Sequence, residues 1–184
     1  MNQYEQAFID ELKSLFSQAN LTLPFKVGDY QFAYNHESVY IRYRDNNYTY
    51  GYCERGQCSE DITSENKDIV LYYPIRDGIP ELGFGYELQH RRYGLDGRII
   101  TFGMMLYYIE LLDKYQLGWR EKLYYELEPI MIKDKMPIEI IQEIGKTGKP
   151  KPLILSLPVD ETIDLKELFT IFKCLIKPYL YRWK

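Results

Sequence analysis

Two alternating runs with a turn cluster between them place the strongest constraint on how this chain folds. The first run puts Val39, Ile41 and Tyr43 on one side of the chain, and residues 48–52 carry tyrosine at every second position. Side chains two positions apart lie on the same face of a strand, so both runs predict β-strands. Residues 45–47, Asp-Asn-Asn, are turn formers. A short turn between consecutive strands predicts an antiparallel pair.

Two neighbouring runs extend the predicted sheet. Residues 30–34 place an aromatic residue at every second position, and a weaker alternating run covers residues 57–63. Gly56 separates this last run from the tyrosine run. The sequence therefore predicts an antiparallel meander of three or four strands.

Apolar residues at helical spacing predict that most of the remaining chain is helical. The predicted helices cover residues 3–19, 68–73, 98–115, 119–132 and 137–145, and a further helix begins at residue 164. The helix near 98–115 is apolar on nearly all sides, which is typical of a core helix. Pro74, Gly78 and Pro80 predict an interruption of the helical segment after residue 73.

The C-terminal part is predicted to be a strand followed by a helix. Residues 153–157 indicate a buried or edge strand, and the capping box Asp164-x-x-Glu167 opens the helix. A chain of 184 residues can bury a full core within one domain. We therefore expect an α+β protein in which residues 1–184 form a single domain, with residues 146–184 packed on the core as a C-terminal extension.

The charge and hydropathy of the chain argue against two classes of partner. The formal net charge is −4 at pH 7. A mildly acidic surface attracts neither nucleic acid nor an anionic membrane. The longest weakly charged stretch, residues 99–112, is too short to span a bilayer. The polar residues 1–6 show no secretory signal, so we expect a cytoplasmic protein.

The three cysteines, Cys53, Cys58 and Cys174, favour reduced thiols. An odd number without framework spacing is typical of a cytosolic protein. Cys53 and Cys58 could form one half of a metal site, but the second half is missing. No cluster of Cys or His accompanies Cys174. We expect free thiols, no metal and no cofactor.

The sequence shows no catalytic constellation. The two histidines, His36 and His90, lie near no Cys or Ser in a recognisable signature. Four carboxylates could support glycosidic chemistry, but their spacing does not distinguish them from solvated charges: Glu54, Glu60, Glu81 and Glu87. We therefore expect a protein that turns over no substrate, with a hydrolase using Glu54 or Glu87 as an alternative hypothesis.

The nineteen tyrosines point to binding. Each tyrosine hydroxyl needs water or a hydrogen-bond partner, and tyrosine is favoured at protein interfaces. Tyr40, Arg42 and Arg44 lie opposite Val39 and Ile41 on the predicted strand, so we expect some of them on an open sheet face. Such a face would bind a protein or a carbohydrate.

Two short strings and one arginine resemble a known family. Residues 50–56 are Tyr-Gly-Tyr-Cys-Glu-Arg-Gly, residues 85–88 are Gly-Tyr-Glu-Leu, and Arg98 precedes the core helix. With the order of the predicted elements over roughly residues 30–127, they resemble the immunity protein 63 family of bacterial polymorphic toxin systems. The resemblance implies an α+β cytoplasmic inhibitor without catalysis, whose partner is a cognate toxin domain.

The strand pattern and the resemblance together suggest roles for individual residues. Glu54 continues the row of tyrosines at 48–52, so we expect a partly buried structural carboxylate that pairs with Arg98, or in second place with Arg76. Arg55 then faces outward and contacts the toxin.

The expected binding residues are Tyr40, Arg42, Arg44, Arg55 and Glu87, and the expected structural residues are Glu54, Gly56 and Arg98. The expected protein is a monomer that binds neither nucleic acid nor membrane. The alternative function is a carbohydrate- or ligand-binding module that uses the tyrosine-rich sheet face.

Overall fold

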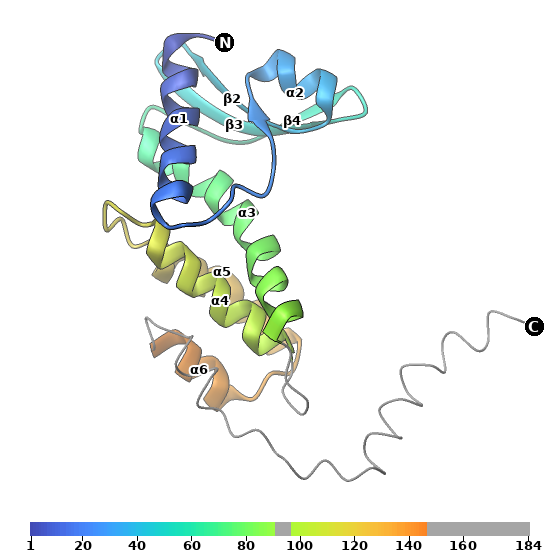
Figure 1. The fold of residues 1–184 in the computed structure, drawn as a ribbon, viewed down its shortest axis with the longest axis vertical. Helices are drawn as coiled ribbons and strands as arrows, with labels where there is room; N and C mark the ends of the chain where they lie inside the picture. The colour runs from blue at the N-terminus through green and yellow to red at the C-terminus, as the bar shows by residue number, and fades with distance from the viewer. Residues whose placement is uncertain (91–96, 147–184) are drawn as a thin grey trace, which may run out of the picture.

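A computed structural model describes residues 1–90 and 97–146 of the chain (Figure 1). Its elements, in chain order, are α1 (Gln3–Gln18), β1 (Val27–Gly28), α2 (Tyr30–His36), β2 (Val39–Arg44), β3 (Asn47–Glu54), β4 (Gln57–Ser64), α3 (Lys67–His90), α4 (Gly97–Leu112), α5 (Trp119–Lys133) and α6 (Ile138–Lys146). A sheet is followed by a helical half, so the predicted α+β class is confirmed. The predicted N-terminal helix is α1, and the predicted core helix is α4.

The sheet has the strand order β1-β2-β3-β4. β2, β3 and β4 form the predicted antiparallel meander, and the two-residue β1 adds a parallel pair at the edge. Asp45 and Asn46 join β2 to β3 with φ angles of 50° and 64°. A two-residue hairpin turn that follows the strand twist needs two positive φ angles, and Asp and Asn tolerate them.

The tyrosines of β3 share one face of the sheet, as their alternation predicts. Tyr50 packs in the main core with Ile41, and its hydroxyl donates a hydrogen bond to Asp77 Oδ2 over 2.9 Å. α1 and the first part of α3 cover this face (Figure 1). α2 covers the opposite face, where Ala33 packs with Tyr40. Both faces are therefore packed at the centre of the sheet, and the described structure has no open tyrosine face there.

The residues predicted as the first strand form the helix α2 instead. Asp29 caps this helix, because its side chain accepts a hydrogen bond from the Phe32 backbone N–H over 2.8 Å. Tyr30 and Tyr34 stack with ring centroids 6.4 Å apart. An alternation over five residues also contains the i, i+4 spacing of a helix, so it does not distinguish the two structures. The strand prediction for residues 30–34 is wrong for this reason.

α3 continues without a break through the predicted interruption, with Pro74 and Pro80 inside it. Each proline removes a backbone hydrogen bond and costs a helix interior about 3 kcal/mol. Leu71, Ile75 and Ile79 of the same helix are fully buried, and burial of such side chains contributes roughly 1.5–3 kcal/mol each. Tertiary packing therefore outweighs the local helix-breaking signal.

α4 packs against α3 and α5 in the helical half. Leu106 of α4 is fully buried. Gly83 allows α3 and α4 to approach closely, because a Cβ there would lie 2.8 Å from the Thr101 carbonyl oxygen. The predicted strand at 153–157 and the helix after it lie outside the described residues.

Polar contacts connect α1 both to the sheet and to α3. Glu5 Oε1 accepts a hydrogen bond from the Tyr43 backbone N–H over 3.0 Å, near the end of β2. Glu11 forms an ion pair with Lys67, the first residue of α3. α1 therefore links the sheet to the helical half.

Candidate protein-binding surface

The Glu-Arg-Gly string forms the turn between β3 and β4. Arg55 and Gly56 have φ angles of 51° and 76°, the two positive values that a two-residue hairpin turn requires. Glycine adopts such angles without strain, which explains Gly56. The Arg55 guanidinium lies 3.8 Å from the Glu54 carboxylate and is otherwise exposed. Arg55 therefore projects into solvent at the tip of the hairpin.

Glu54 is exposed, which corrects its expected partial burial. Along its row, exposure rises from 1% at Tyr50 to 38% at Tyr52, and the Glu54 side chain is 55% exposed. The row leaves the packed core before the strand ends, so the carboxylate needs no buried partner. Arg98 and Arg76, the expected partners, form ion pairs with aspartates of their own.

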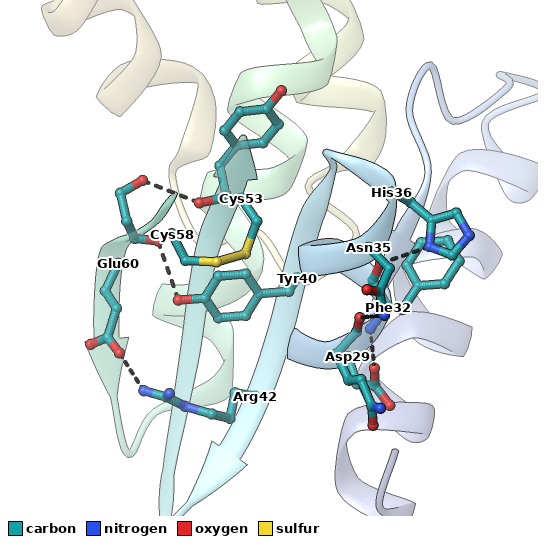
Figure 2. Close-up of a disulfide and its surroundings, with 12 residues drawn as sticks. Asp29, Phe32, Asn35, His36, Tyr40, Arg42, Cys53, Cys58 and Glu60 are labelled. Carbon is teal, nitrogen blue, oxygen red and sulfur yellow. Dashed lines mark hydrogen bonds and ion pairs between the residues drawn. A yellow bond between two sulfur atoms is a disulfide. The ribbon is translucent and has the colours of Figure 1, made fainter. Parts of the chain in front are cut away.

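A disulfide between Cys53 and Cys58 closes the hairpin directly behind the turn (Figure 2). The two residues are opposite each other in the register of β3 and β4, with Cα atoms 4.0 Å apart. The expectation of free thiols is therefore wrong for this pair. Counting cysteines does not show that a tight hairpin brings two of them face to face. Cys174 lies outside the described residues.

Tyr40 lies beneath the surface of the sheet. Its ring crosses Gly51 of the next strand, and its hydroxyl donates a hydrogen bond to the Ser59 carbonyl oxygen over 3.2 Å (Figure 2). A Cβ at Gly51 would lie 2.7 Å from the tyrosine ring, so the ring fills the space of the missing side chain. Tyr40 is 1% exposed. Its burial corrects the expectation that it lies on an open sheet face, and a partner cannot reach it in this conformation.

Arg42 remains at the surface of β2. Its guanidinium pairs with Glu60 of β4 (Figure 2) and lies 5.8 Å from the centroid of the Tyr30 ring. Tyr34 is about half-exposed, and its hydroxyl would lie 3.6 Å from a Cβ at Gly56, so it is next to the hairpin turn. We define the α2–hairpin surface as Tyr30, Tyr34, Arg42, Arg55 and Glu60.

Arg44 lies at the other end of the sheet from Arg55. Its exposed side chain pairs with Asp45 at 3.4 Å, beside the β2–β3 turn. β3 has eight residues, which separate the two turns by about 23 Å. The structure therefore separates Arg44 from the predicted binding residues of the α2–hairpin surface.

Glu87 is buried in the helical half, with 3% of its surface exposed. It packs against the first residue of α4, since a Cβ at Gly97 would lie 2.9 Å from Glu87 Cδ. A carboxylate beside a helix N-terminus is stabilised by the free N–H groups there. Arg98, the next residue, forms an ion pair with Asp134 across 3.6 Å. Glu87 therefore joins α3 to α4, and its burial puts it out of reach of a partner in this conformation.

A second exposed surface follows the C-terminal half of α3. Phe84 and Leu88 are 52% and 54% exposed. On the same helix lies a groove of about 500 Å³, which we call the α3 groove; its lining includes Leu23, Glu81, Leu82, Gly85, Tyr86 and Tyr108. The sequence pattern did not predict this surface. The one sequence signal there is the Gly-Tyr-Glu-Leu string at residues 85–88, whose exposure depends on where other helices pack.

Each histidine stacks on an aromatic ring one helical turn before it. His36 stacks on Phe32 with centroids 4.3 Å apart, and His90 stacks on Tyr86 at 3.9 Å. Across residues 1–90 and 97–146, no three His, Cys, Asp or Glu side chains form a group that could hold a metal ion. No helix within these ranges combines the length and apolarity needed to cross a membrane. Both histidines thus serve local packing on their own helices.

Residues 45–129 match the model of the immunity protein 63 family. The resemblance carried by the Glu-Arg-Gly and Gly-Tyr-Glu-Leu strings is thereby confirmed. The match includes the β3–β4 hairpin and all of α3, and so it contains the turn and the α3 side of the groove. No curated protein and no solved structure matches the chain.

Proposed function

We propose, from the family match over residues 45–129, that this chain is an immunity protein that binds and neutralises a cognate bacterial toxin domain. Neutralisation is by protein–protein contact and involves no catalysis. The family match is the observation that carries the proposal. The carbohydrate-binding alternative has no such support, since both faces of the sheet are packed at its centre.

Exposed arginines are the proposed contacts within the sheet half. Arg42 and Arg55 belong to the α2–hairpin surface together with two half-exposed tyrosines, and Arg44 lies at the opposite end. Arg and Tyr are enriched among residues that dominate interface energies. The net charge of −4 favours encounter with a basic toxin domain, and added salt then slows association.

The direct test is co-expression with the cognate toxin, which the proposal expects to be encoded directly upstream of this gene. We expect this protein to restore growth of cells that produce the toxin, and the purified pair to form a complex. A toxin that stays fully active in the presence of excess folded protein contradicts the proposal.

Two arginine variants locate the contact. Asn tolerates the positive φ of Arg55, so Arg55→Asn removes the charge and keeps the turn. We expect it to weaken toxin binding by roughly tenfold, a typical value for an interface hot spot. Arg44→Asn tests the other end of β3, and Lys13→Gln on α1 serves as a surface control outside both regions. If Arg55→Asn and Arg44→Asn both bind the toxin as tightly as wild type does, the sheet half does not belong to the interface.

We further propose a cytoplasmic monomer in which residues 1–184 form one domain. The Cys53–Cys58 disulfide bears on the compartment, because disulfides persist mainly in oxidising environments. Alkylation of thiols in intact cells, before lysis, tests in which compartment the protein resides. Reactive Cys53 and Cys58 support the cytoplasm, whereas protection of both until a reductant is added supports an oxidising compartment.

A further inference from the structure

Three parts of the chain build the α3 groove. Leu23 and Pro24 come from the connector after α1, Leu82 and Tyr86 from α3, and Tyr108 from α4. Leu23, Leu82 and Tyr108 also pack against the main core. The Tyr86 ring is held in place by stacking on the following turn of its helix. The fold itself therefore shapes this groove.

Gly85 lines the groove without a structural reason to be glycine. A Cβ at Gly78 would lie 2.9 Å from Phe25, and one at Gly83 would lie 2.8 Å from a carbonyl oxygen of α4, so close packing explains both. At Gly85, no heavy atom of the described chain lies within 4 Å of a Cβ, and its φ is not positive. Glycine weakens a helix interior relative to alanine. The explanation that remains for glycine at position 85 is that it lets another molecule approach the helix backbone.

Apolar and acidic side chains border Gly85. Phe84 and Leu88 lie one helical turn apart and are half-exposed. Leu88 follows Glu81 by two turns, so both lie on the same side of α3; Glu81 lines the groove and Leu88 lies beside it. Glu81 is exposed and has no ion pair or hydrogen bond with the part of the chain that the structure describes. A partner therefore meets apolar surface beside an uncompensated carboxylate.

We infer that the α3 groove receives a segment of the toxin that carries an apolar side chain next to a lysine or arginine. This inference rests on the proposed function. The apolar side chain contacts Phe84 and Leu88, the segment's backbone passes over Gly85, and the cation pairs with Glu81. Charge complementarity selects this occupant, because an acidic segment would place like charges together at Glu81.

Calorimetric titration with the purified upstream-encoded toxin domain tests the inference. Gly85→Gln fills the space for backbone approach, Leu88→Gln removes apolar contact, and Glu81→Lys reverses the charge. We expect each variant to bind the toxin at least tenfold more weakly, a loss typical of interface hot spots. Two matched controls, Ile69→Gln on the same helix with 46% exposure and Glu65→Lys just before it, should bind within about twofold of wild type.

Gly85→Ala separates lost binding from lost folding. Alanine has open space at this position and favours helix, so the variant should melt at a higher temperature while binding the toxin more weakly. A wild-type protein that does not bind the toxin overturns the proposed function. If wild type binds the toxin and the three groove variants bind it as tightly as wild type, the inference about the groove is overturned, and the proposed immunity function is not. Sedimentation of wild type as a dimer that Gly85→Gln dissociates also overturns it, since the occupant is then a second copy.

Discussion

The sheet and the C-terminal half of α3 use similar residues in opposite ways. In the sheet, Gly51 makes room for the Tyr40 ring, and Tyr50 is buried with its hydroxyl bonded to a carboxylate. In α3, Gly85 faces open space and Phe84 is half-exposed. Gly51 and Tyr50 of the sheet each have a contact inside the chain that explains them. Gly85 and Phe84 of α3 have no such contact in the described structure.

This difference separates residues that the fold requires from residues available to a partner. The tyrosine-rich sheet was predicted from the sequence to present a binding face, but its central aromatic residues pack inside the protein. What the sheet presents to solvent is its rim, chiefly Arg55 at the hairpin turn and Arg44 at the opposite end. The helical half presents a groove with apolar borders.

The largest effect is expected from Gly51→Ala. The new Cβ overlaps the Ser59 carbonyl oxygen and lies 2.7 Å from the Tyr40 ring. Backbone on both strands must shift, so the free energy of unfolding should fall by roughly 3 kcal/mol, the upper range for overpacking. Urea denaturation measures this loss. An unchanged midpoint would mean that the ring moves away freely and that the sheet does not depend on Gly51.

Loss of the disulfide should have the next largest effect. The double variant Cys53→Ala/Cys58→Ala opens a loop of six residues, 53–58, whose closure contributes about 2 kcal/mol in the chain-entropy model. We expect a lower urea midpoint and faster amide exchange in β3 and β4, with α3 unaffected. Reductant should produce the same change in wild type and none in the variant. If α3 exchanges faster as well, the two regions are not independent.

A smaller, pH-dependent effect is expected at Glu11 of α1, which pairs with the first residue of α3. Burial raises the pKa of Glu11, but hydrogen bonds from Lys67 and Tyr115 outweigh it and hold the pKa below its ordinary value of 4.5. Because the folded pKa is the lower one, this stabilisation is complete above pH 4.5 and is lost as the pH falls through the folded pKa. The hydrogen bond to Glu11 raises the pKa of Lys67 above 10.5, so stabilisation is also lost in strongly alkaline solution.

Glu11→Gln should therefore destabilise the protein by about 1 kcal/mol at neutral pH, given the partial exposure of the pair. The difference from wild type should shrink as the pH is lowered below 4.5. Melting temperatures at several pH values provide the measurement. A difference that does not change with pH would show that packing, and not charge, accounts for the role of Glu11.

The smallest effect, and one of opposite sign, is expected from Gly85→Ala. With open space around the new Cβ, only helix propensity changes, and the free energy of unfolding should rise by about 0.8 kcal/mol. Comparison with Gly51→Ala under the same conditions gives the sharpest contrast between the two regions. A destabilised Gly85→Ala variant would mean that the fold does require this glycine.

Much of the sheet could be predicted from the sequence, because hairpins depend on local signals. Alternation defines β2 and β3, and the Asp-Asn and Arg-Gly pairs occupy turn positions with positive φ. The candidate site was harder to predict. Arg55 is exposed because hairpin turns lie at the surface, but Tyr40 and Glu87 are buried by other elements that pack on them, α2 and the start of α4.

The sequence by itself determined the α+β class, which side of β2 and of β3 carries which residues, and the hairpin turns, because these follow from short-range spacing. It also determined the family resemblance, which rests on two short strings and the order of the elements. Only the tertiary structure decided what covers each face. It buried Tyr40, exposed Glu54, kept α3 continuous through two prolines and left Gly85 facing an open groove. Burial depends on how separate elements pack on one another, and a local pattern contains no information about where the covering helices lie.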